Sequence, residues 1–251
     1  MTSDATTYEL YYWHMIQGRG EMVRLALEDA GVPYTDVCRR PESEGGGVDA
    51  IERLLGDARR GPRPFAVPAL VVDGSMVLSQ TAAILHWLAP RIGLAPDGEA
   101  ERAWALELQL TVSDAFSEAH DTHHPLGAGL YYEDQKPEAA RRSADFVANR
   151  MPKFLAHFES ALAENPAGAR SCLVGDRVSY VDLSLFQIFE GLRYAFPRAT
   201  ANLAKDYPAL GALHDKVENR PNIKKYMASE RRLEFNTSGI FRHYPELDQD
   251  A

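Results

Sequence analysis

A polar triplet, Ser79-Gln80-Thr81, stands at the start of an apolar run, Thr81 to Ile92, that reads as a helix. The first amides of a helix are free and its dipole is positive there, so such a start can bind an anion. The same side chains can instead cap the helix, and both roles are compatible because they use one group of amides. Pro68 opens the preceding strand, where a proline is permitted as the first residue.

Two tyrosines, Tyr11 and Tyr12, stand side by side in an aromatic run that predicts a strand over residues 8–13. Phenol hydroxyls donate and accept hydrogen bonds, so either residue could hold a reacting group. Neighbouring strand residues face opposite sides, so only one of the two can serve a given site. The alternative is that both are packing aromatics.

Histidines gather in the stretch His120-Asp121-Thr122-His123-His124. His120 and His124 are four residues apart and could share a helix face, a spacing that can suit a metal ion. No third or fourth ligand stands at a fixed spacing, so no metal is expected. The two cysteines, Cys38 and Cys172, form neither a CxxC pair nor a metal spacing, and such sparse usage fits a reducing compartment.

The first third of the chain mixes strands and helices, which predicts an α/β layer in which helices cover a sheet. Apolar spacing predicts helices over residues 21–30, 48–55 and 81–92, and strands over residues 8–13, 34–38, 69–72 and 76–78. Residues 93–98 contain glycine and proline and are expected to form a linker. The sequence therefore predicts one domain at residues 1–92 and a second at residues 99–251.

The second domain is predicted to be all helical, with helices over residues 99–119, 139–163, 181–194, 210–218 and 222–229. Pro152 should kink or restart the second of these helices. Ser179 and Asp182 have the spacing of a capping box, in which the Asp182 carboxylate accepts from the Ser179 amide. That pattern is interpreted as structural, because it fixes the start of an apolar helix.

The length, composition and net charge of the chain argue against several classes of partner. The 251 residues, 45% of them hydrophobic, are enough for two domains with their own cores. Acidic residues outnumber basic ones by 36 to 27, and the net charge of -9 argues against nucleic acid or an anionic membrane as a partner. No signal peptide is expected, and no apolar stretch approaches the roughly 18 residues that span a bilayer. A cytoplasmic protein is expected.

Three motifs in this order resemble the cytosolic glutathione S-transferase family, closest to its tyrosine-using classes of sigma and pi type. They are YELYYWHMIQGRGEMVRLALEDAGVPY at the start, VPAL...DG...LSQTAAI in the middle, and LVGDRVSYVDLSLF late in the chain. The resemblance covers nearly the whole chain. It implies a thioredoxin-like, glutathione-binding N-terminal domain followed by an all-α helical bundle, and it implies a homodimer.

The resemblance places a catalytic tyrosine hydroxyl at the end of the first strand, where it would stabilise the glutathione thiolate. Aligning QGRGE with the family's motif favours Tyr12 over Tyr11, if one extra residue lies in the loop from His14 to Gln17. Arg19 matches the second arginine of the motif and would support the site, whereas Gln17 replaces the first. The dipole of the helix that starts near Gly18 would also favour the sulfur anion.

The resemblance also implies how glutathione is held. A cis Val67-Pro68 bond would turn the Val67 backbone toward the cysteinyl part of glutathione, which would pair there like an added strand. Gln80 and Thr81 would hold the γ-glutamyl carboxylate, and Asp114 would approach the γ-glutamyl ammonium across the dimer. The cation for the glycyl carboxylate has no clear counterpart, and the choice stays open among Arg39, Arg40, Arg59, Arg60 and Arg63.

The implied reaction is conjugation of the glutathione thiolate to small hydrophobic electrophiles in detoxification, or a related isomerase or peroxidase reaction. Glutathione is the co-substrate, and no metal is implied. Topology predicts that the electrophile pocket is lined by His14, Met15, His124, Tyr131 and Phe235. The alternative function is a non-enzymatic carrier of hydrophobic ligands, or an assembly module, with this fold. A cysteine-using thiol transferase is disfavoured because no cysteine ends the first strand.

Overall fold

The computed structural model describes residues 6–57 and 63–248. Its first part contains a four-stranded sheet with the order β2-β1-β3-β4. The strands are β1 (Tyr8–Tyr11), β2 (Thr35–Asp36), β3 (Ala69–Val72) and β4 (Met76–Ser79). β1 pairs in parallel with β2 and antiparallel with β3, and β3 pairs antiparallel with β4.

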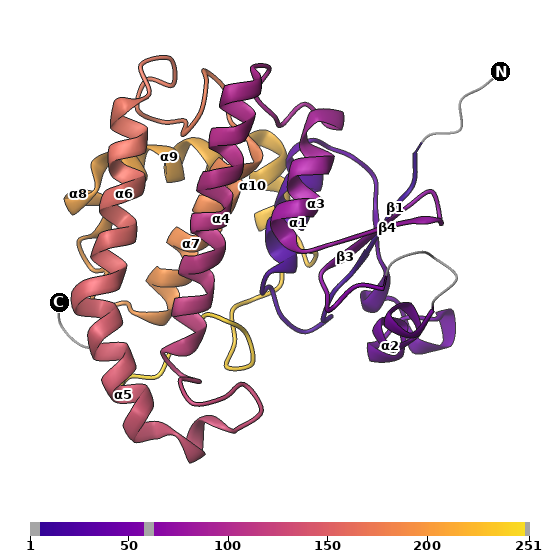
Figure 1. The fold of residues 1–251 in the computed structure, drawn as a ribbon, viewed down its shortest axis with the longest axis horizontal. Helices are drawn as coiled ribbons and strands as arrows, with labels where there is room; N and C mark the ends of the chain where they lie inside the picture. The colour runs from indigo at the N-terminus through magenta and orange to yellow at the C-terminus, as the bar shows by residue number, and fades with distance from the viewer. Residues whose placement is uncertain (1–5, 58–62, 249–251) are drawn as a thin grey trace.

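Helices cover both faces of this sheet (Figure 1). They are α1 (Gly20–Asp29), α2 (Val48–Gly56) and α3 (Thr81–Leu88). Residues of α1 and α3 share the main core with Leu10 and Leu70, whereas residues of α2 form a second core cluster with Tyr11 and Val71. Successive strand residues face opposite sides, so the two faces of β1 serve two different helix layers.

The rest of the chain is a helical bundle that lies beside α1 and α3 (Figure 1). Its helices are α4 (Glu99–Asp121), α5 (Lys136–Asp145), α6 (Met151–Glu164), α7 (Tyr180–Ala195), α8 (Leu203–Asp206), α9 (Pro208–Glu218) and α10 (Pro221–Met227). The largely buried α7 packs on both α4 and α1, so the main core continues from the sheet layer into the bundle. The predicted fold class is confirmed.

Most predicted elements are present, with local differences. A π-helical turn, Phe146–Arg150, joins α5 to α6, and Pro152 stands in the first turn of α6. Proline has no amide to donate, so the expected interruption at this position is confirmed. The predicted strand over residues 34–38 is only two residues long, because Val37–Arg39 turns into a 3-10 helix. The apolar spacing gives no signal for the single-turn α8.

The capping box at the start of α7 is also confirmed. The Asp182 carboxylate accepts hydrogen bonds from the Ser179 amide at 2.7 Å, the Ser179 hydroxyl at 2.8 Å and the Leu173 amide at 2.7 Å. Burial raises the pKa of Asp182 to about 6, against these hydrogen bonds, which lower it. The carboxylate therefore fixes both the start of α7 and the loop before it.

Residues 228–248, the C-terminal segment, follow α10 without forming another helix and are drawn in yellow in Figure 1. Phe235 stacks on Tyr194 of α7, with ring centroids 4.8 Å apart. The Phe241 ring packs against Gly191, where a Cβ atom would lie only 2.2 Å from it. The segment is therefore anchored by aromatic side chains on the bundle. Within residues 6–57 and 63–248, no helix is long and apolar enough to cross a membrane.

Candidate functional site

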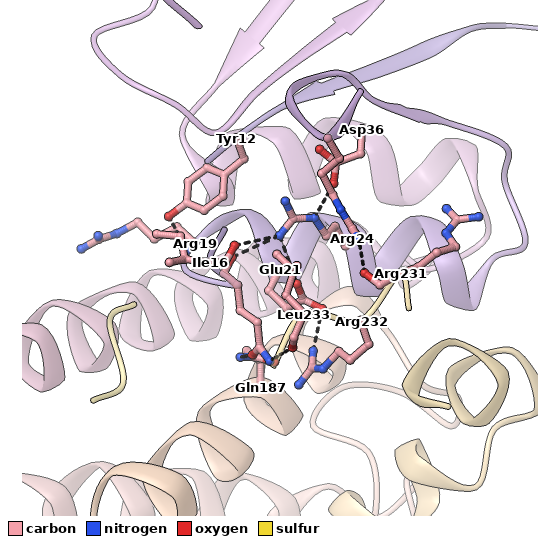
Figure 2. A network of polar contacts seen from close by, with 12 residues as sticks. Tyr12, Ile16, Arg19, Glu21, Arg24, Asp36, Gln187, Arg231, Arg232 and Leu233 are labelled. Atoms are coloured by element: carbon pink, nitrogen blue, oxygen red, sulfur yellow. Dashed lines mark hydrogen bonds and ion pairs between the residues drawn. The ribbon is translucent and has the colours of Figure 1, made fainter. Parts of the chain in front are cut away.

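Tyr12 directly follows β1, and its ring packs against Gly18 and Gly20 at the start of α1. Its hydroxyl oxygen accepts a hydrogen bond from the Arg19 amide at 2.9 Å, as Figure 2 shows. Burial raises the pKa of Tyr12, against the Arg19 amide and the nearby Arg19 and Arg24 guanidinium groups, which lower it. The phenol therefore keeps its proton at neutral pH. Because its oxygen already accepts from Arg19, that proton is available to donate to a ligand.

Two glycines make this placement of Tyr12 possible. A Cβ atom at Gly18 would lie 2.2 Å from the Tyr12 hydroxyl oxygen, and one at Gly20 would lie 2.5 Å from Cγ of the ring. Gly18 also has a φ of 47°, which side chains other than that of glycine rarely adopt. The glycine spacing in QGRGE is thus explained by the ring that packs on it.

Tyr11 lies on the opposite face of the sheet. It belongs to the second core cluster, with Ala50 and Leu54 of α2. Tyr12 has the position that the sequence alignment favoured, beside the start of α1. Its catalytic role stays a prediction.

The Val67-Pro68 peptide bond is cis, as predicted. It leads into β3, while α3 begins just after the neighbouring strand β4. Gln80, directly before α3, has a φ of 68°, and no side chain caps the helix start. The first amides of α3 are thus left without a side-chain cap, which is the arrangement that can hold an anion.

Thr81 links the starts of α3 and α1. Its hydroxyl donates a hydrogen bond to the Arg19 carbonyl oxygen at 3.2 Å. The Arg19 guanidinium in turn donates to the Ser117 hydroxyl on α4 at 3.1 Å. Arg19 therefore lies where the sheet layer meets the helical bundle, with its amide on Tyr12 and its side chain on α4.

A cavity of about 740 Å³ opens between these elements. Its lining includes all six residues predicted to bind glutathione, which are Arg19, Val67, Pro68, Gln80, Thr81 and Asp114. They come from the start of α1, the loop before β3, the start of α3 and the middle of α4. Asp114, which the resemblance assigned to the site across a dimer, is exposed and lines the cavity of its own chain. The volume is in the ordinary range for a small-molecule site.

The residues predicted to line the electrophile pocket are not gathered in one cavity within the described part of the chain. Phe235 lines a hollow of only about 10 Å³, beside Gln17 and Gly18. Met15 is exposed, and its carbonyl oxygen accepts from the Asn236 side chain at 2.8 Å. The other three lie elsewhere: His14 in the loop after β1, His124 buried after α4, and Tyr131 exposed in the following loop. This pocket stays a prediction.

None of the described arginines proposed for the glycyl carboxylate lines the cavity. Arg39 donates to the carbonyl oxygens of Glu230 and Arg231, at 2.8 Å and 2.5 Å. Arg40 donates to the Thr35 hydroxyl at 3.4 Å. Arg63 is exposed, and residues 59 and 60 lie outside the described residues. The choice of cation stays open.

A buried ionic network supports the loop between Tyr12 and α1 (Figure 2). The fully buried Glu21 carboxylate lies 2.6 Å from the Arg232 guanidinium and 3.2 Å from that of Arg24. It also accepts from the Tyr226 hydroxyl at 2.5 Å. Burial alone would raise the pKa of Glu21, but the two arginines hold it below its usual value. Sequence reasoning missed this network, whose only local signal is the three-residue spacing of Glu21 and Arg24.

Gln17, which replaces an arginine of the family's motif, also helps to hold the loop between Tyr12 and α1. Its side-chain oxygen accepts from Gln187 of α7 at 2.7 Å, and its amide nitrogen donates to the Leu233 carbonyl oxygen. Arg24 continues the network to Asp36 at 2.7 Å. The loop that carries the glycines is therefore tied to α7 and to the C-terminal segment.

Comparisons with known proteins agree with this architecture. Residues 120–230 match the family model described as Glutathione S-transferase, C-terminal domain. The chain is 25% identical to a glutathione S-transferase of Plasmodium yoelii yoelii, over 86% of this chain and 90% of the relative. It is 27% identical to one of Dirofilaria immitis, over 93% of this chain and 98% of the relative.

Solved structures show the same fold. A Pi-class glutathione S-transferase of Onchocerca volvulus superposes with a TM-score of 0.66 at 23% identity, covering 88% of this chain and 92% of that one. A prostaglandin synthase D of Nilaparvata lugens has a TM-score of 0.66 at 21% identity, with 90% and 100% covered. These likenesses show that the chain has the fold of glutathione S-transferases.

Proposed function

We propose that the protein is a glutathione transferase of the tyrosine-using, sigma- or pi-like type, which conjugates the glutathione thiolate to small hydrophobic electrophiles. The observation that carries the proposal is the Tyr12 hydroxyl, which keeps its proton and accepts a hydrogen bond from the amide of Arg19, a residue that lines the cavity. Curated relatives named glutathione S-transferase across most of the chain length support it.

In this proposal, glutathione lies in the cavity that Arg19 and Thr81 line. Its cysteinyl backbone pairs with Val67 beside the cis bond. Its γ-glutamyl carboxylate occupies the start of α3 at Gln80 and Thr81, where uncapped amides and the helix dipole favour an anion. Its ammonium lies near the exposed Asp114 carboxylate.

The chemistry then depends on the charge of the sulfur. A free thiol has a pKa near 8.5 and is mostly protonated at neutral pH. The Tyr12 hydroxyl donates to the sulfur once the thiol proton has left, and each unit by which this lowers the thiol pKa corresponds to about 1.4 kcal/mol. The thiolate forms the new carbon–sulfur bond, and the leaving group departs with the bonding electrons. Detoxification of electrophiles is the proposed role.

An isomerase reaction is the second candidate. The fold is shared, at TM-scores of 0.66, with prostaglandin synthase D of Nilaparvata lugens and with rat hPGDS in complex with a quinoline. The same thiolate would add to the substrate and leave again after rearrangement. Turnover of an isomerisable substrate without net consumption of glutathione would distinguish this reaction from conjugation.

A homodimer is part of the proposal. The Phe65 side chain is 93% exposed, and Leu110 is 52% exposed on the other wall of the same cavity. Large apolar side chains exposed at one rim favour burial against a second copy. The division into a glutathione-binding domain at residues 1–92, a linker at 93–98 and a helical domain at 99–251 is proposed with it, as is a cytoplasmic location.

The test is a pair of conservative substitutions. Tyr12→Phe removes the hydroxyl and keeps the ring, so turnover of a chloro-dinitrobenzene should fall and the pKa of bound glutathione, read from the pH dependence of kcat/KM, should rise. Tyr11→Phe is the matched control, because Tyr11 lies on the opposite face of the sheet, and its activity should be that of the wild type. An unchanged rate in Tyr12→Phe would reject this role, and failure of the wild type to bind glutathione would favour a non-enzymatic carrier.

A further inference from the structure

Three histidine rings converge where α4 ends. His120 stands in the last turn of α4, and His123 and His124 follow in the turn after it. One ring nitrogen from each histidine lies within 4.8 Å of the other two. The spacing of three and four residues puts the rings on one side of the helix end. His123, which sequence reasoning did not use, supplies the third member of the cluster.

The partners of His120 and His123 indicate which nitrogen of each of these two rings carries a lone pair. His123 Nε2 lies 2.8 Å from the Ile240 carbonyl oxygen, which only accepts, so this nitrogen carries the proton. The lone pair is then on His123 Nδ1, which is in direct contact with Nδ1 of His124. His120 Nδ1 lies 3.3 Å from the Asp121 carboxylate, which leaves Nε2 of that ring as the free donor of electrons. Metal-binding histidines are typically oriented by outer partners of these two kinds.

Charge and burial keep the cluster neutral. Burial lowers the pKa of all three histidines, that of His123 to about 3, and the nearby Arg242 lowers them further. Neutral imidazole is the form that binds a metal. Arg242 also repels a cation, whereas the carboxylates of Asp121 and Glu133 act on His120 and His124 in the opposite sense.

We propose that His120, His123 and His124 bind one divalent cation of the zinc type, with water as the fourth ligand. Three imidazole nitrogens at about 2.0–2.1 Å from a tetrahedral ion lie roughly 3.3 Å from one another. The three ligand atoms lie within 4.8 Å of one another, so binding in this proposal includes side-chain rotations that shorten the distances between them. His120 is the most exposed of the three, with 24% of its side chain accessible, and gives the ion a route in from solvent.

The site has a structural consequence apart from the proposed transfer reaction. His123 contacts the C-terminal segment twice, through the Ile240 carbonyl oxygen and through the Tyr244 ring, with centroids 6.3 Å apart. An ion held by the three histidines would thus fasten this segment to the end of α4.

A second histidine-containing cluster lacks the same chemistry. His214 lies close to Asp215 and Glu218. Its two ring nitrogens face carboxylates, Glu190 at 3.0 Å and Asp215 at 3.4 Å. Burial would lower the pKa of His214, but Glu190 raises it above its usual value. Each ring nitrogen of His214 thus already has a carboxylate partner of its own.

Titration with zinc chloride tests the proposal. Full-length protein without an affinity tag is treated with a chelator, dialysed and titrated calorimetrically at neutral pH. The wild type should bind one zinc ion per chain. Asp121→Asn should weaken binding by about 10-fold or more, as loss of an outer partner does, and His120→Ala should weaken it further, beyond about 100-fold. His157→Ala removes an exposed histidine on α6 and should bind as the wild type does.

Two further measurements make the outcome decisive. Cobalt(II) should give the intense visible bands of tetrahedral coordination with the wild type and only the weak bands of a hydrated ion with His120→Ala. Zinc should raise the Tm of the wild type and leave that of His120→Ala unchanged, while the two metal-free proteins melt alike. Absence of stoichiometric binding, equal affinity in His120→Ala, or equal loss in His157→Ala would overturn the proposal.

Discussion

Gly20 lets the Tyr12 ring lie against the start of α1, so a methyl group there should displace the ring. A Cβ atom at Gly20 would lie 2.5 Å from Cγ of Tyr12, whereas ordinary contact begins at 3.4 Å, so the ring or the helix must yield by about 0.9 Å. A misplacement near 1 Å at a reacting group costs roughly 100-fold in rate, or about 2.7 kcal/mol. We expect Gly20→Ala to lose about this much kcat/KM with a chloro-dinitrobenzene.

The loss should come from the position of the hydroxyl and only partly from stability. Alanine favours a helix by about 1 kcal/mol over glycine, whereas overpacking costs about 1–3 kcal/mol. The free energy of unfolding, measured with urea, should therefore fall by no more than about 2 kcal/mol. A folded enzyme with a raised pKa of bound glutathione is the expected result.

Two comparisons decide whether the reasoning holds. Gly56→Ala makes the same change at the last residue of α2, where a Cβ atom would meet nothing within 4 Å, and should keep full activity. In a Tyr12→Phe background, Gly20→Ala should cost little further rate, because the group it displaces is already gone. Full activity of Gly20→Ala, or an equal loss in the Tyr12→Phe background, would refute the argument.

Three further changes have definite expected results. Glu21→Gln leaves the buried Arg24 and Arg232 without their shared carboxylate, and urea denaturation should show a loss of about 3 kcal/mol or more. Burial raises the pKa of Asp182 to about 6 in the folded protein, above the ordinary aspartate value of about 3.9, so the stability that this group contributes is present below about pH 3.9 and is lost as the pH rises through 6. Over this pH range, the free energy of unfolding of the wild type should fall by about 3 kcal/mol more than that of Asp182→Asn. An equal pH dependence of the two free energies would contradict this. Thr81→Val removes the hydroxyl at the start of α3, so the KM for glutathione should rise about 10-fold, the effect of about 1.4 kcal/mol, with a smaller change in kcat.

The sequence predicted the fold because each element carries its own local signal. The helical spacing of Met22, Val23, Ala26 and Leu27 is present because these residues enter the core. Pro152 interrupts a helix wherever the helix lies, because the missing amide is a property of the residue itself. The six residues predicted to bind glutathione came from separate motifs, and the fold brings them to one cavity.

The rest of the site could not be predicted because it depends on contacts between distant parts of the chain. The Arg232 guanidinium reaches Glu21 across 211 residues, and neither residue has a local signal for the other. The histidine cluster depends on the turn after α4, which keeps His123 beside His120 of the last helical turn. The position of Phe235, which is predicted to line the electrophile pocket, depends on how residues 228–248 lie. That segment has no helical or strand periodicity in its sequence.

The bond from Gln17 to the Leu233 carbonyl oxygen spans 216 residues and has a consequence for the nascent chain. Translation makes Tyr12, the glycines beside it and Pro68 early, whereas Arg232 and Leu233, which contact Glu21 and Gln17, leave the ribosome much later. Until then, Glu21 has only Arg24 as a charged partner in its own helix, and the loop after β1 lacks its far anchor. The early sheet layer can collapse during synthesis, but the loop after β1 gains this anchor only when residues 232 and 233 join the fold. A chain cut short near residue 225 would therefore carry every residue predicted to bind glutathione and still lack the anchor.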